Sequence, residues 1–133
     1  MNLSFDRVIK DYVTPPAVLE RNKGNMYLYR YDIVEASSTE PSDEDIPVPE
    51  GTKYSFVEVL LPGYPNKNEV IKYLIRQLVS LEDELKIIND YNEVLHLDPD
   101  YVNSEEYKTY MEYLRVRHEI KSKVRTDFDN YSI

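Results

Sequence analysis

The chain has 133 residues, of which 41% are hydrophobic and 31% are charged, and its formal net charge is −9. This length suits one domain with a single modest core. The negative charge disfavours direct binding to nucleic acid or to an anionic membrane surface. No apolar run approaches the roughly 20 residues that a membrane-spanning helix needs. The absence of cysteine excludes disulfides, thiolate metal sites and a cysteine nucleophile.

The first 25 residues are expected to form an irregular N-terminal arm. Apolar side chains in residues 3–13 could line one side of a short helix, and residues 17–21 could form another helical turn. Pro15 and Pro16 separate these two segments and stop any helix there, because proline lacks the amide donor and restricts the residue before it. Two interpretations stay open for this arm, one as part of the core and one as a contact with a neighbouring subunit.

Two strands are predicted next, on either side of an acidic loop. Residues 26–35 alternate with period two, which places Tyr27, Tyr29, Tyr31 and Ile33 on one side. Residues 53–61 alternate in the same way, with Ser55, Val57, Val59 and Leu61 on one face. Residues 36–51 are rich in serine, proline and acid, and are expected to form a mobile loop. The two strands should pair antiparallel across it.

Helices are predicted for the rest of the chain. Asn66 is a good N-cap for a helix ending near Val79, and Ser80 for one ending near Glu93. Asn103 or Ser104 should begin a last helix. The fold class is therefore α+β: a two-stranded antiparallel ribbon packed with two or three C-terminal helices. Residues 26–126 should form one domain, between an arm (1–25) and a tail (127–133).

Patterns typical of catalytic or metal sites are weak. Asp98 and Asp100, and also the acids at 127 and 129, resemble calcium loops, but the third oxygen ligand, the glycine and the closing glutamate of such loops are missing after Asp98. His96 and His118 have no zinc-binding spacing, and none of the three glycines frames a serine as in a nucleophile elbow. We therefore expect no catalytic residue, cofactor or metal, and no enzymatic activity.

Tyrosines and a basic segment are the best candidates for protein contacts, since tyrosine pairs a large apolar ring with a polar tip. The strand tyrosines could cover the helices or meet another subunit. The helix tyrosines are three residues apart and drift by about 60° per step, so they cannot all face the core. The basic segment could stabilise a helix end or dock an acidic surface, such as residues 36–51 of a neighbouring copy. The candidate contact residues are Tyr27, Tyr29, Tyr31, Tyr107, Tyr110, Tyr113, Arg115, Arg117 and Lys121.

Two segments resemble a known group of proteins. Residues 78–97 carry Glu84, Leu85 and the Ile87–Asn92 run, and residues 105–121 carry Glu105, Glu106, Tyr107, Tyr110 and Arg115. Together they resemble the C-terminal helices of small proteins from tailed phages and prophages of gut bacteria. The resemblance implies a virion-associated or assembly role, with other copies or other virion proteins as partners. It carries over no catalytic residue. Residues 1–13 lack the charged-then-apolar order of a signal peptide, so synthesis in the host cytoplasm is expected.

These observations lead to one main hypothesis and one alternative. The main hypothesis is a non-enzymatic structural or assembly protein of a tailed-phage virion, such as a capsid accessory, fibre or adaptor. The alternative is an acidic inhibitor that imitates nucleic acid and binds a host protein; it requires the acids to be arrayed along one face. Neither hypothesis involves a membrane or direct binding to nucleic acid.

Overall fold

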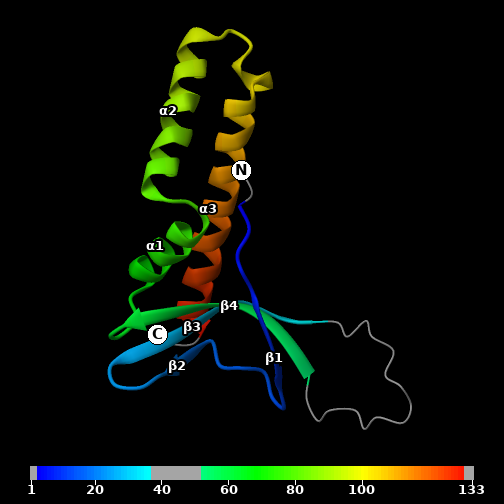
Figure 1. The fold of residues 1–133 in the computed structure, drawn as a ribbon, viewed down its shortest axis with the longest axis vertical. Helices are drawn as coiled ribbons and strands as arrows, with labels where there is room; N and C mark the ends of the chain where they lie inside the picture. The colour runs from blue at the N-terminus through cyan, green and yellow to red at the C-terminus, as the bar shows by residue number, and fades with distance from the viewer. Residues whose placement is uncertain (1–2, 37–51, 131–133) are drawn as a thin grey trace, which may run out of the picture.

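The computed structural model describes residues 3–36 and 52–130. It is an α+β fold in which a four-stranded antiparallel sheet, ordered β1-β4-β3-β2, carries the helices on one face (Figure 1). The elements in chain order are β1 (Val8–Tyr12), β2 (Leu19–Arg21), β3 (Met26–Glu35), β4 (Thr52–Pro62), α1 (Lys67–Leu78), α2 (Leu81–Leu97), a short 3₁₀ turn η1 (Tyr101–Asn103) and α3 (Glu105–Asn130).

The predicted ribbon is the centre of this sheet. β3 and β4 pair antiparallel, with Tyr29 opposite Val59 and Tyr31 opposite Val57. The expected alternation of β4 is confirmed, because Val57, Val59 and Leu61 all join the core under the helices. The expected two strands are thus half of the sheet. The predicted loop lies almost wholly outside the described residues, since only residue 36 of it is described.

The N-terminal segment adds the two outer strands, so the predictions of an irregular arm and of helical turns within it are wrong. β1 pairs with β4, and β2 pairs with β3 at the opposite edge. The backbone groups of two central strands need partners on both sides, and this segment supplies them. The connection between β1 and β2 crosses the face of the sheet that the helices leave open (Figure 1).

This crossing buries a cation on the far face of the sheet. Arg30 is 5% exposed; its Nη1 donates to the backbone carbonyl of Ala17 at 2.8 Å and its Nη2 to Glu20 at 2.6 Å. The guanidinium lies 5.5 Å from the ring centre of Phe56, which is fully buried. A buried charge is tolerated only with such partners. The crossing segment therefore covers Arg30 and is also held in place by it.

A β-bulge interrupts the alternation of β3. After the Tyr31–Val57 pair, Val34 and not Ile33 stands opposite Ser55, so the predicted placement of Ile33 beside Tyr31 is wrong. Asp32 takes up the extra residue with φ = +53°, a conformation that aspartate tolerates better than most residues. Arg7 fixes this point by an ion pair with Asp32 at 3.1 Å and by a hydrogen bond to Ser55 at 2.7 Å.

The helix starts follow the predicted caps, whereas two helix ends differ. Asn66, Ser80 and Ser104 each accept a backbone N–H of the first turn. α2 continues through Leu97, four residues beyond the predicted end. α3 continues to Asn130 and places Phe128 in the core, so residues 127–130 belong to the helix. Within the described part of the chain, no helix is both long and apolar enough to cross a bilayer.

Candidate protein-contact surface

Three of the candidate tyrosines belong to the core. Tyr29 is fully buried, Tyr31 is 8% exposed and Tyr113 is 3% exposed. Burial, with the neighbouring Asp127, raises the pKa of Tyr29 well above its usual value, and burial raises the pKa of Tyr31 to about 12. The strand tyrosines therefore cover the helices, and the subunit contact considered for Tyr29 and Tyr31 is not available in this fold.

Tyr29 also links the sheet to the C-terminal part of α3. Its hydroxyl donates to Asp127 Oδ2 at 2.5 Å, and Asp127 is 4% exposed. The Nζ of Lys123, one helical turn earlier, lies 3.7 Å from the same carboxylate. Tyr29 thus fixes the last turns of α3 on the sheet.

The remaining candidate tyrosines are partly exposed. Tyr27 packs edge-on against Tyr64, with ring centres 5.8 Å apart. Tyr110 stacks on Tyr91 with ring centres 3.9 Å apart and planes 6° apart, and Tyr107 lies against the same ring at 6.3 Å. The rings of Tyr91, Tyr107 and Tyr110 fill the space between α2 and α3, so most of their area already has a partner within the chain.

The α2–α3 hairpin projects away from the sheet (Figure 1) and has two different faces. A polar cleft opens on one face and is lined by Lys86, Ile87, Asp90, Glu105, Glu106 and Thr109. Each residue advances about 100° around a helix, so Leu81, Leu85 and Met111 lie on the opposite side. They are 56%, 51% and 45% exposed. We call these three residues the hairpin face, and it has no covering element among the described residues.

The candidate basic residues do not stand at a helix end. α3 continues past them, and its last turn contains no cation, so the predicted stabilisation of the helix C-terminus is wrong. Arg115 is exposed and forms ion pairs with Glu112 and Glu119, each at 2.5 Å. Its charge is therefore already matched on its own helix.

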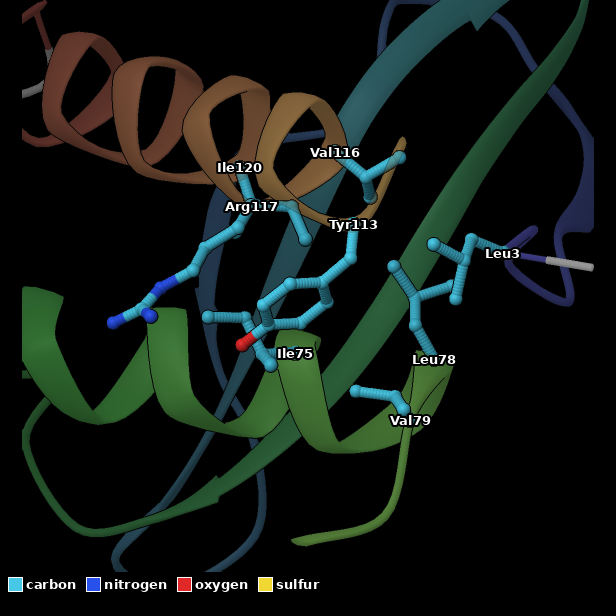
Figure 2. A pocket seen from close by; sticks show the side chains of 8 residues that line it. All are labelled: Leu3, Ile75, Leu78, Val79, Tyr113, Val116, Arg117 and Ile120. Atoms are coloured by element: carbon cyan, nitrogen blue, oxygen red, sulfur yellow. The ribbon is translucent and has the colours of Figure 1, made fainter. Parts of the chain in front are cut away.

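Arg117 instead meets α1 and α2 in a groove. This basic groove has a volume of about 200 Å³ and is lined by Asn68, Ile71, Lys72, Ile75, Arg76, Glu84 and Arg117. Figure 2 shows Arg117 and Tyr113 leaving α3 toward α1; on the other side of Tyr113 lies a very small apolar cavity that Leu3 helps to close. The groove is thus the polar side of a contact among all three helices.

Glu84 is the acid of this groove and is already engaged. It accepts two hydrogen bonds from Arg76, at 3.0 and 3.2 Å, and one from the hydroxyl of Tyr113. The hydrogen bonds from Arg76 are the main reason why the pKa of Glu84 lies below its usual value. Burial, with Glu84, raises the pKa of Tyr113 to about 12. Lys72 and Arg76 were missed by sequence reasoning, although their four-residue spacing places both on one side of α1.

The residues considered for metal binding or histidine chemistry lie apart in the structure. Among the described residues, no group of three or more metal-ligating side chains gathers. His96 and His118 are exposed on different helices. Asp98 and Asp100 form a turn in which each accepts a local hydrogen bond, and Asp127 accepts from Tyr29.

Comparison of the chain with protein-family models, with curated proteins and with solved structures finds no match.

The candidate surface consists of two features, the hairpin face and the basic groove. They meet on α2, where Glu84 lines the groove and Leu85 belongs to the hairpin face.

Proposed function

We propose that the chain is a non-enzymatic structural or assembly protein, and that it serves in the particle of a tailed phage as an adaptor, fibre or capsid accessory. It acts through protein–protein contacts with other copies of itself or with other virion proteins. The observation that carries this proposal is the hairpin face. Leu81, Leu85 and Met111 remain about half exposed on a two-helix projection, and apolar side chains grouped in this way favour association.

The partner that the hairpin face fits best is the same face of a second copy. Two helical hairpins that join by their apolar sides form a four-helix bundle, in which each hairpin covers the exposed apolar side chains of the other. The contact is self-complementary, as a two-fold dimer requires. α2 has 17 residues and is about 26 Å long, which gives room for several layers of side chains.

Light scattering coupled to size exclusion at micromolar concentration tests this proposal. The wild type should be a dimer or larger, and Leu85→Glu combined with Met111→Glu should be a monomer with an unchanged far-UV circular dichroism spectrum. Leu97→Glu is the matched control, because Leu97 is 75% exposed at the hairpin tip and lies outside the hairpin face. This variant should keep the wild-type mass.

Mass spectrometry of purified phage particles tests the proposed location. The chain should be present at a fixed ratio to the major particle proteins. A wild type that stays strictly monomeric, together with its absence from particles, would overturn the proposal.

A further inference from the structure

The basic groove carries an excess of positive charge in a strongly acidic chain. Lys72, Arg76 and Arg117 line it against the single acid Glu84, while the chain as a whole has a net charge of −9. Lys121 and Arg125 follow Arg117 at four-residue steps, so they extend the same stripe along α3. Positive charge that is concentrated on one part of an acidic protein favours an acidic partner.

Most of these cations have no ion-pair partner within the described residues. Arg76 pairs with Glu84 at 3.0 Å, but Lys72, Arg117, Lys121 and Arg125 form no ion pair within residues 3–36 and 52–130. The Nε of Arg117 is moreover buried without a hydrogen-bond acceptor. A buried donor without an acceptor is costly, and a carboxylate entering the groove would offset that cost.

The size and charge of the groove select the class of ligand. A volume of about 200 Å³ is below the usual range for whole small-molecule ligands, but it accommodates one acidic side chain. A nucleic acid would meet the negative charge of the rest of the molecule along its length. An acidic stretch of polypeptide is the ligand that meets both conditions.

We propose that the basic groove binds the acidic segment of a second copy, residues 40–50. This segment reads EPSDEDIPVPE and contains five acids and no base, so it complements the groove in charge. In the chain order it comes between β3 and β4 and precedes Thr52, the first residue of β4, whereas α1 follows Pro62 at the other end of β4 (Figure 1). β4 spans about 33 Å, which favours a second copy over the same chain as the source. This inference rests on the proposed self-association and names a second contact within it.

Fluorescence anisotropy with a labelled synthetic peptide of residues 40–50 tests the inference. The receptor is the full chain with Asp43, Glu44 and Asp45 changed to Asn, Gln and Asn, so that its own acidic segment does not compete with the peptide. The peptide should bind, and affinity should fall at least tenfold on Arg117→Gln and measurably on Lys121→Gln. Arg115→Gln is the matched control, because Arg115 is already paired on its own helix, and it should leave affinity unchanged. Raising the salt concentration should weaken binding.

A peptide with its five acids changed to amides separates charge recognition from unspecific adhesion. It should not bind, and equal binding of both peptides would overturn the inference, as would equal losses for the Arg115 and Arg117 variants. Circular dichroism and Arg117→Lys, which retains the charge, show whether lost binding reflects lost folding. If the wild type is a dimer and the receptor with its own acids neutralised does not bind the peptide, the groove contact is refuted and the hairpin contact is left intact. A monomeric wild type refutes self-association, and with it the second copy as the source.

Discussion

The buried pair of Tyr29 and Asp127 gives the most direct test of how this fold is held together. Tyr29→Phe removes one hydroxyl and keeps the ring, so packing is retained while the buried carboxylate loses a donor at 2.5 Å. A hydrogen bond to a charged group contributes about 1.5–3 kcal/mol. Lys123 remains 3.7 Å from the carboxylate and is partly exposed, so Asp127 does not become fully unpaired. We expect a loss of about 2 kcal/mol in the free energy of unfolding.

The reciprocal change should cost a similar amount for a different reason. Asp127→Ala removes the charge and leaves the Tyr29 hydroxyl buried without an acceptor, at about 1–3 kcal/mol. Because the double variant removes both polar groups together, it should be more stable than the sum of the single losses predicts. The difference should be about 1.5–2 kcal/mol, as expected for groups in direct contact.

Urea unfolding followed by circular dichroism measures all four proteins. The slope of the unfolding free energy against urea concentration should be the same for all four proteins, so that differences in midpoint report differences in stability. Tyr27→Phe is the matched control on the same strand, since Tyr27 is only half-buried, and it should cost less than 0.5 kcal/mol. A Tyr29→Phe protein within 0.5 kcal/mol of the wild type, or strictly additive losses, would refute this account of the pair.

Four further outcomes can be measured in the same way. The lowered pKa of Glu84 means that its stabilisation is present above pH 4.5 and is lost as the pH falls through the folded value, so wild type and Glu84→Gln should converge in midpoint as the pH falls below 4.5. The pKa of Tyr113 is raised to about 12, so stability should fall between pH 10 and 12, and less so in Tyr113→Phe. Phe128→Ala should cost about 3–5 kcal/mol by emptying a core position. Removing the Ser80 cap by alanine should cost about 1 kcal/mol, whereas alanine at the exposed Ser122 should cost under 0.5 kcal/mol.

The parts of the fold that could be predicted are those fixed by nearby residues. Asn66 and Ser80 begin helices because each side chain reaches an amide two or three residues away. The alternation of β4 is equally local, since neighbouring side chains always point to opposite faces. The bulge at Asp32 has no such signal, because no glycine marks it and Asp32 stands within an otherwise regular alternation.

The outer strands could not be predicted because their stability comes from their partners. β1 reads VIKDY, and its three central side chains, Ile9, Lys10 and Asp11, are exposed to solvent. Its formation depends on the free edge of β4, more than 40 residues later in the sequence. The buried tyrosines have the same origin, since the hydroxyl of Tyr29 can enter the core because Asp127, 98 residues away, accepts its hydrogen bond.

The roles of the basic residues could not be predicted from the sequence, because they depend on where α3 ends. A helix stopping near residue 126 would place the basic segment at its C-terminus, where the helix dipole accounts for it. Because α3 continues to Asn130, that explanation fails, and each cation must find its own partner. Arg115 does so on its own helix, whereas Arg117 turns toward α1 and α2 and leaves one nitrogen buried without an acceptor. The length of one helix thus decides that two neighbouring arginines have different roles, and it is this difference that the Arg115 and Arg117 variants measure.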